Sequence, residues 1–265
     1  MDLTEPRVMG ILNVTPDSFY DGFRFTDETA ILNQAEKMMQ EGADFIDIGG
    51  YSTRPGAEAV SEEEELRRVL PALKAVVKKF PEATVSIDTF RSSVAAQAIA
   101  SGAAIVNDIS CGELDRHMIA TVAASKVPYV AMHMRGTPQT MSQLTDYNHL
   151  LKEIIDYFHQ KIALLYHAGV TDVIIDPGFG FAKTGAQNFE LLNKLEYFKI
   201  LGKPILAGLS RKSMVWKTLG TDPEHALNGT TALNTIALVK GASLLRVHDV
   251  REAKETIQLV NQLAP

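Results

Sequence analysis

The sequence predicts an eight-stranded β/α barrel, because eight short apolar runs alternate with helical patterns along the whole chain. Continuous apolar runs are typical of strands that are buried on both faces. Eight such units favour a closed barrel over the rival architecture, a doubly wound open sheet, which has fewer strands. The length of 265 residues fits one barrel, so we expect a single domain over residues 1–265.

Each apolar run leads into a polar residue, a charged residue or glycine. The runs are Val8–Leu12 before Asn13, Phe45–Ile48 before Gly49, Val85–Ile87 before Asp88, Ala104–Val106 before Asn107, Val130–Met132 before His133, Val173–Ile175 before Asp176, Ile205–Ala207 before Gly208 and Leu244–Leu245 before Arg246. In such barrels the active site lies where the strands end. We therefore expect one polar rim there.

Apolar residues with helical spacing fill the segments between these runs. Ser61 and Glu64 have the spacing of a capping box. Asp222 and Pro223 are typical of a cap and a first helical turn. The expected stripes include Ile31, Ala35, Met38 and Met39 before Gly42; Leu66, Val69, Leu70, Leu73 and Val77; Leu227, Leu233 and Ile236; and Ala253, Ile257 and Val260.

Composition limits the partners and the compartment. The net charge of −6 argues against nonspecific nucleic-acid binding, although a few cations in a cleft can still hold an anion. Cys111 is the single cysteine, which excludes an internal disulfide and fits a reducing compartment. Residues 1–7 lack the apolar core of a signal peptide, and no segment is long enough to span a bilayer. We expect a cytoplasmic protein without membrane partners.

Three of the connections after strands mix glycine and proline with aromatic and charged residues. They cover residues 13–22, 49–56 and 176–183. Long loops of this composition are more often lids or binding loops than simple turns.

Asp88, Asn107 and Asp176 each follow a predicted strand, so all three should face the mouth of the barrel. Two carboxylates and an amide can accept hydrogen bonds from a flat nitrogen heterocycle, to which the amide can also donate. The alternative is that these residues only cap the following helices. A metal cluster is disfavoured because no His or Cys shares the spacing.

The segment from Gly208 to Ser213 contains two cations. Ser210 could cap a helix, which would place Arg211 and Lys212 in its first turn. Cations there oppose the helix dipole, so they indicate a function, such as donation to a carbonyl or a ring nitrogen. The alternative is a pair of solvated surface cations.

Arg246 and His248 alternate at the end of the last strand, so their side chains should point the same way. Together they suit an anion site, and phosphate sites often lie after strands seven and eight of such barrels. The alternative for His248 is a buried core imidazole. Asn13 and Arg54 come from the first two loops and could reach the same anion. An amide oxygen beside phosphate oxygens suits Mg²⁺, so Asn13 is the candidate metal ligand.

At these residues the sequence resembles the dihydropteroate synthase family over nearly its whole length. The motifs are residues 9–19 (MGILNVTPDSF), 47–56 (DIGGYSTRPG), 176–183 (DPGFGFAK), 210–213 (SRKS) and 246–249 (RVHD). The resemblance implies a transferase that joins a dihydropterin carrying a hydroxymethyl pyrophosphate to p-aminobenzoate, giving dihydropteroate and pyrophosphate for folate biosynthesis. It also implies a homodimer that is formed through late helices, and sulfonamides that compete at the p-aminobenzoate site.

The resemblance also implies roles for individual residues. The pterin would be held by Asp88, Asn107, Met132, Asp176, Phe181, Gly208, Lys212 and Arg246. Pyrophosphate would meet Asn13, Thr53, Arg54, Arg246 and His248, with Mg²⁺ at Asn13. The p-aminobenzoate site would use Phe19, Pro55, Phe181, Lys212 and Ser213. The catalytic set would be Asp21, Arg54, Lys212, Arg246 and His248.

The chemistry agrees with a dissociative substitution, because loss of pyrophosphate leaves positive charge on a methylene conjugated to the pterin. Catalysis then needs stabilisation of the leaving group more than a strong base. Asp21 would stabilise the cation, and closure of the loops would exclude water.

Two positions depart from the family pattern. Tyr51 stands where glutamate is usual, and Phe23 follows Gly22 where a small residue is usual. Two other functions remain open at this point: a folate-binding methyltransferase domain, and a pterin-binding paralogue without catalysis.

Overall fold

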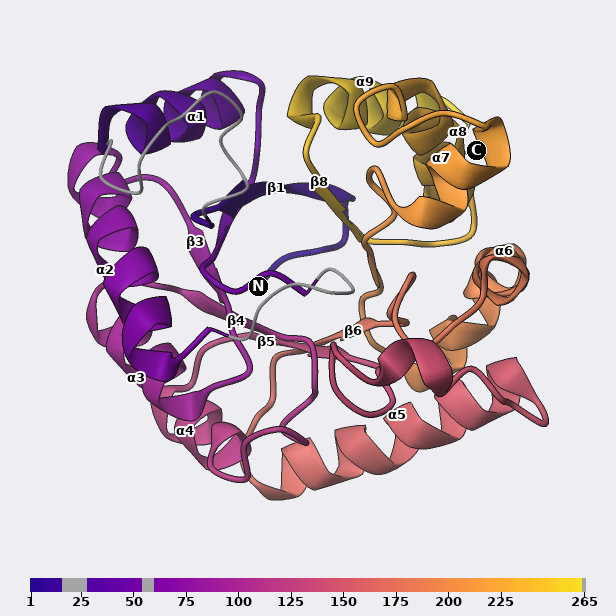
Figure 1. The fold of residues 1–265 in the computed structure, drawn as a ribbon, viewed down its shortest axis with the longest axis horizontal. Coiled ribbons are helices and arrows are strands. Elements are labelled where there is room, and N and C mark those ends of the chain that lie inside the picture. The colour runs from indigo at the N-terminus through magenta and orange to yellow at the C-terminus, as the bar shows by residue number, and fades with distance from the viewer. Residues whose placement is uncertain (16–27, 54–59, 264–265) are drawn as a thin grey trace.

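The computed structural model describes residues 1–15, 28–53 and 60–263. Its eight strands form one parallel sheet in the order β6-β5-β4-β3-β2-β1-β8-β7. The strands are β1 (Arg7–Asn13), β2 (Phe45–Gly49), β3 (Val85–Asp88), β4 (Ile105–Asp108), β5 (Tyr129–Met132), β6 (Val173–Asp176), β7 (Leu206–Ala207) and β8 (Leu244–Val247). A parallel bridge between Ile175 and Ile205 joins the two ends of the sheet. The predicted barrel is confirmed (Figure 1).

Helices surround the strands on the outside of the barrel (Figure 1). They are α1 (Glu28–Gln40), α2 (Glu62–Lys79), α3 (Ser92–Ala100), α4 (Met118–Ser125), α5 (Leu150–His167), α6 (Gly185–Asn193), α7 (Ser213–Leu219), α8 (Leu227–Val239) and α9 (Val250–Asn261), with 3₁₀ turns η2 (Met141–Gln143) and η3 (Leu195–Leu201). In the described part of the chain, no helix is both long and apolar enough to cross a membrane.

The start of α2 follows the predicted cap. The Ser61 side chain accepts a hydrogen bond from the Glu64 backbone N–H at 3.2 Å. The Glu64 carboxylate pairs with Arg67 and Arg68, each at 2.7 Å. The cap at Ser61 is confirmed, and the Glu64 side chain forms ion pairs with Arg67 and Arg68.

The cap predicted at Asp222 is wrong. Helix α8 begins at Leu227, and Ala226 occupies the cap position. The Asp222 carboxylate instead accepts from the backbone N–H groups of Glu224 and His225, at 2.9 and 3.0 Å. A carboxylate at this position could cap a helix, but the Asp222 carboxylate closes a separate turn that precedes α8.

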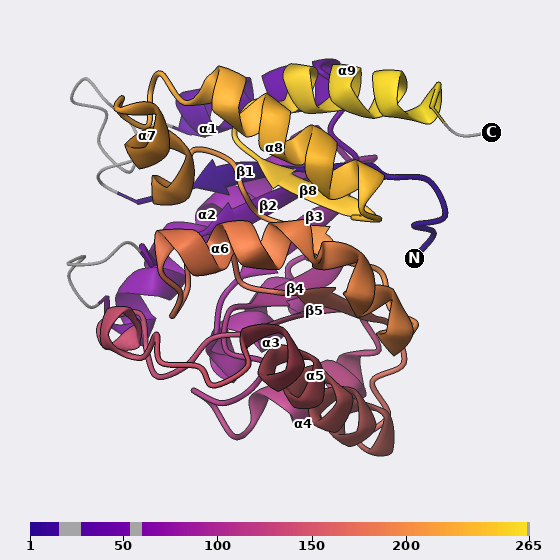
Figure 2. The same ribbon diagram turned by 90° about the vertical axis from the view of Figure 1, so that its right-hand side faces the viewer.

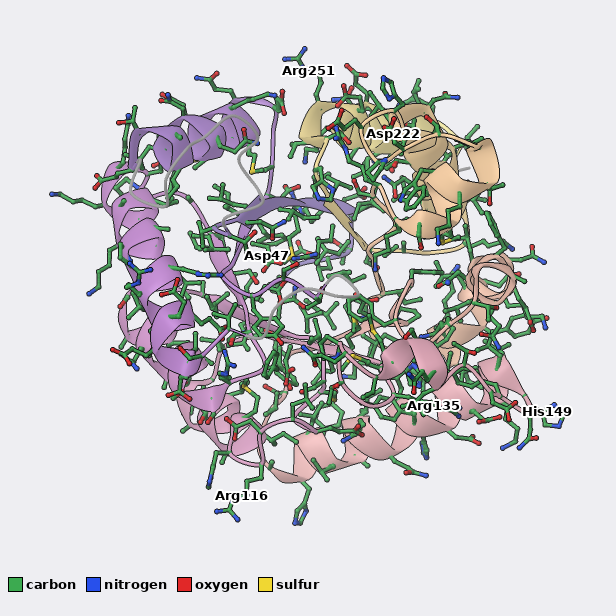
Figure 3. The ribbon with its side chains drawn as sticks, in the orientation of Figure 1. Asp47, Arg116, Arg135, His149, Asp222 and Arg251 are labelled. Atoms are coloured by element: carbon green, nitrogen blue, oxygen red, sulfur yellow. The ribbon has the colours of Figure 1, made fainter. Side chains whose placement is uncertain are left out.

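Inward-facing side chains fill the barrel in layers, as the two-residue repeat of strands requires. The lower layer is a buried apolar cluster composed of Leu3, Met9, Phe45, Ile105, Val130, Ile174, Leu206 and Leu244. Two residues further along their strands lie Asp47, Asn107, Met132, Asp176, Gly208 and Arg246. This upper layer lies nearer the carboxyl ends of the strands, and Figure 3 shows Asp47 in the interior of the barrel.

Candidate active site

A buried ion-pair network joins strands β2, β3, β4 and β8. Arg246 donates from Nε to Asp47 at 2.6 Å and from Nη2 to Asp88 at 2.5 Å. Asn107 donates from Nδ2 to the same Asp47 oxygen at 2.9 Å. Burial disfavours the charge of Arg246, but Asp47 and Asp88 outweigh that effect and raise its pKa. The guanidinium therefore stays charged at any pH that matters for activity.

The two carboxylates of this network share one cation. Burial raises the pKa of Asp88 to about 7, the Arg246 charge acts in the opposite direction, and the Asp47 carboxylate adds to the rise. The Oδ1 atom of Asp47 is buried without a hydrogen-bond partner. The network is therefore under-satisfied, with more acceptors than donors.

Asp47 was missed as a site residue by the sequence reasoning. It lies inside the apolar run Phe45–Ile48, and its side chain is fully buried. A carboxylate within a strand that is buried on both faces is costly unless it is paired, and this was the available signal. It holds Arg246 and fixes the orientation of the Asn107 amide.

Asp176 and Lys212 come together at the opposite side of the upper layer. Asp176 Oδ1 accepts the Gly178 backbone N–H at 2.8 Å. A Cβ added to Gly208 would lie 3.9 Å from Lys212 Nζ and 4.0 Å from Asp176 Oδ2. Gly208 thus leaves open space between the acid and the lysine.

The pKa values of this pair reflect the burial and the neighbouring charges. Burial raises the pKa of Asp176, against the effects of Lys212 and Arg246. Burial lowers the pKa of Lys212 to about 8, with Asp176 opposing and Arg246 reinforcing the shift. Asp176 therefore lies near Lys212 at Gly208, and the charge of Arg246 also acts on its carboxylate.

Lys212 occupies the cap position of α7, not its first turn. Its ammonium donates to the Phe179 carbonyl and lies 4.6 Å from the centroid of the Phe181 ring. The predicted position of Lys212 in the first helical turn is therefore wrong, because the helix begins later than expected.

The predicted roles of Ser210 and Arg211 are wrong. Ser210 does not cap α7. Its hydroxyl contacts His248 Nδ1 at 3.0 Å and accepts the His248 backbone N–H at 3.1 Å. Arg211, with φ of 55°, forms a double ion pair with Asp249 at 3.0 and 2.6 Å. Both residues join the loop after β7 to the loop after β8, which orients the His248 ring.

Lys183 is a second residue that the sequence reasoning missed, although it ends the third motif. Its buried ammonium donates to the carbonyls of Gly178 and Phe181, each at 3.0 Å, and contacts His133 Nδ1 at 3.1 Å. Burial lowers the pKa of Lys183 to about 7. These contacts shape the loop that carries Phe181 and attach it to the end of β5.

An apolar wall forms one side of the mouth. Its buried members are Ile109, Met132, Met134, Met141 and Ala182, with Phe90, Leu114 and Phe181 packed against them. Met132 and Phe181 therefore belong to the same apolar cluster. An aromatic ring and a thioether suit contact with a flat heterocycle.

Asn13 ends β1 beside this network. A Cβ added to Gly49 would lie 3.6 Å from Asn13 Oδ1 and 3.3 Å from Asp88 Cβ. Among the described residues there is no group of three or more His, Cys, Asp or Glu placed to hold a metal ion. Asn13 thus fits only an ion that takes most of its ligands from substrate or water.

Only some of the remaining predicted site residues lie in the described part of the chain. Ser213 is exposed and begins α7. Thr53 is half-buried after β2. Phe19, Asp21, Phe23, Arg54 and Pro55 lie outside the described residues.

Comparison with known proteins agrees with this geometry. The family described as "Pterin binding enzyme" matches residues 9–248. The dihydropteroate synthase of Synechocystis sp. is 46% identical over 259 residues, which are 97% of this chain and 89% of the relative. That of Escherichia coli is 41% identical over 262 residues, which are 98% and 92% of the two chains.

Solved structures give the same result. The Yersinia pestis dihydropteroate synthase in a sulfonamide drug complex aligns with a TM-score of 0.94 and 40% identity, covering 99% of this chain and 96% of the other. The Xanthomonas albilineans enzyme with 4-aminobenzoic acid gives 0.92 and 40%, covering 100% and 96%. The resemblance noted in the motifs is confirmed, and the chain belongs to the pterin-binding enzyme family, among the dihydropteroate synthases.

Proposed function

We propose that this chain is a transferase of folate biosynthesis that condenses 6-hydroxymethyl-7,8-dihydropterin pyrophosphate with p-aminobenzoate to 7,8-dihydropteroate and pyrophosphate. The observation that carries the proposal is one polar layer at the strand ends, in which Asp176 and Lys212 lie on either side of Gly208 and Arg246 pairs with Asp47 and Asp88. Two solved relatives support the second substrate: the Xanthomonas albilineans enzyme with 4-aminobenzoic acid and the Thermus thermophilus enzyme in complex with 4-aminobenzoate.

The pterin ring would be recognised by the upper layer. Asn107 gives its amide N–H to Asp47, so its carbonyl oxygen is the group left to accept from a ring N–H. The Asp176 carboxylate would accept from the amino-pyrimidine edge, and Lys212 would donate to the ring carbonyl or nitrogen. Met132 and Phe181 would pack on the faces of the ring, and Gly208 would leave the space.

Arg246 changes partners in this proposal. Without substrate its charge is held by Asp47 and Asp88. Pterin N–H groups that bind Asp88 would release part of the guanidinium, which could then face the pyrophosphate beside His248. Arg246 thus serves both the pterin and the leaving group.

The substitution would be dissociative. The bond from the pterin methylene to pyrophosphate breaks first, and the amine of p-aminobenzoate then attacks the cation and loses a proton. Arg246, His248, Arg54 and Thr53 would stabilise the leaving anion. Asp21 would stabilise the cation, and Phe19, Pro55, Phe181, Lys212 and Ser213 would enclose p-aminobenzoate.

Asn13 would hold Mg²⁺ through its amide oxygen, with pyrophosphate oxygens and water completing the coordination. When bound, the ion would neutralise charge on the leaving group. A carboxamide with few other protein ligands suits this use, because Mg²⁺ commonly retains several waters.

We also propose a cytoplasmic homodimer. The single, buried cysteine supports a reducing compartment. Helices α8 and α9 lie side by side on the outside of the barrel (Figure 2). They expose Ile236, Val239 and Leu259, which supports an apolar interface. Sedimentation of the protein and of Val239→Glu tests this: a dimer that becomes a monomer is expected, and a monomeric parent protein contradicts it.

The test of the activity is direct. Purified protein is incubated with both substrates and Mg²⁺, and dihydropteroate and pyrophosphate are measured. We expect both products in equal amounts. Well-folded protein that binds the pterin without turnover would indicate a non-catalytic paralogue and overturn the proposed reaction.

A further inference from the structure

Tyr51, the residue that departs from the family pattern, joins three loops of the barrel rim. It lies two residues after the end of β2. Its hydroxyl oxygen accepts from Gln139 Nε2 at 2.7 Å, in the loop after β5. Its ring meets the Phe90 ring edge-on, with centroids 5.1 Å apart, in the loop after β3. The Arg91 guanidinium lies 5.5 Å from the same ring.

Both contacts of Tyr51 lead to the apolar wall of the mouth. Phe90 packs against the cluster that contains Met132 and Met141. Gln139 lies two residues before Met141, the first residue of η2. Tyr51 therefore attaches the start of the loop after β2 to the same wall that would pack on the pterin.

Arg91, next to Phe90 in the loop after β3, also contacts Val60, which follows the loop after β2. Arg91 donates to the Val60 carbonyl at 2.6 Å. Its charge is matched by the fully buried Glu65 carboxylate, which also accepts from Thr89 Oγ1 at 2.6 Å. Phe90 and Arg91 thus contact residues on both sides of the segment 52–59.

The base of the loop has one further anchor. Arg68 of α2 donates to the Gly50 carbonyl at 3.0 Å and pairs with Glu64 at 2.7 Å. Arg68 lies on the outside of the barrel and Tyr51 reaches across its rim, so the backbone at residues 50–51 is held from both directions. Thr53, a proposed pyrophosphate contact, follows two residues later.

We infer that Tyr51 is a positioning residue that holds the start of the loop after β2, up to Thr53, against the apolar wall of the mouth, so that Thr53 is held in register with the pterin. The inference rests on the proposed function. Glutamate, which is usual at this position in the family, has no ring to pack on Phe90.

The experiment compares Tyr51→Phe, Gln139→Leu and the double variant. Tyr51→Phe keeps the ring on Phe90 and removes the hydroxyl. Binding of the pterin pyrophosphate and of the bare pterin is measured by calorimetry, together with KM and kcat. We expect each single variant to weaken the pyrophosphate form about three- to fivefold, as loss of one hydrogen bond implies, with the bare pterin changed less than about twofold.

The double variant should weaken binding no more than either single variant, because both remove the same contact. Tyr197→Phe, at an exposed tyrosine of η3, is the matched control and should change nothing. Additive losses, or equal losses for the two ligands, would overturn the inference. Product formation by the parent protein separates the two possible failures. If the proposed function is wrong, the parent protein forms no dihydropteroate, whether or not the Tyr51 contacts matter for binding.

Discussion

The two inward-facing layers of the barrel lie on the same strands, two residues apart, yet they differ in the polarity of their side chains. The lower layer is buried and mainly apolar, with Met9, Phe45 and Val130 among its members and the small Ser86 side chain paired with Ile105. The upper layer carries the buried carboxylates Asp47 and Asp176 and the partly buried Arg246. The lower layer stabilises the fold, whereas the upper layer costs stability for the sake of a ligand.

The two layers differ in the charged groups that they carry. In the upper layer, Asp47 Oδ1 has no partner and two carboxylates compete for Arg246. A site left short of donors is a site prepared for a ligand that brings N–H groups.

The largest expected effect is that of Arg246→Ala. It leaves the buried Asp47 and the partly buried Asp88 without their cation, which should cost about 3 kcal/mol of unfolding free energy. Urea denaturation measures this. Adding Asp47→Asn should restore part of the loss, because the uncompensated charge is removed. A fully stable Arg246→Ala protein would contradict the description of this network.

Lys212→Met separates function from stability. We expect kcat/KM to fall by about two to three orders of magnitude, as for loss of one group that stabilises charge. The thermal midpoint should stay or rise, since burial disfavours the Lys212 charge. A large drop in the midpoint with activity retained would show that Lys212 is structural.

Ile174→Ala makes the opposite test in the lower layer. The side chain lies two residues below Asp176 and is 3% exposed. The cavity should cost about 2–4 kcal/mol, measured by urea denaturation. KM for both substrates should change less than about twofold. A change in KM as large as that of an upper-layer variant would remove the distinction between the layers.

The smallest effect is on pH dependence. With a pKa of about 8, Lys212 is protonated below that pH and loses its charge above it. We therefore expect kcat/KM to fall as the pH rises through about 8. Lys212→Arg should move this alkaline limb upward, because arginine stays charged. If the alkaline fall of kcat/KM is unchanged in Lys212→Arg, a group other than Lys212 causes it.

The strands and the rim could be predicted because buried barrel strands appear in the sequence as apolar runs, and the rim residues follow these runs directly. Asp47 could not be recognised in this way, since one carboxylate does not interrupt an apolar run. Ser210 and Asp222 were misassigned because a hydroxyl or carboxylate that caps a helix can equally hold a turn or a ring.

The partners of the predicted residues were beyond the sequence. Arg246 binds Asp47 across 199 residues of chain, and only the closure of the barrel brings them together. The anion role of Arg246 was therefore predicted without the two carboxylates that share its charge. Lys183 and Tyr51 act through contacts of the same long-range kind.

The most direct test of the upper layer as a pterin site is a crystal structure of the complex with dihydropterin pyrophosphate. We predict the ring between Asp176, Asn107 and Lys212, the pyrophosphate beside His248, and Asp88 turned from Arg246 toward a ring N–H. A ring bound elsewhere, with the ion pairs of Arg246 unchanged, would contradict the account.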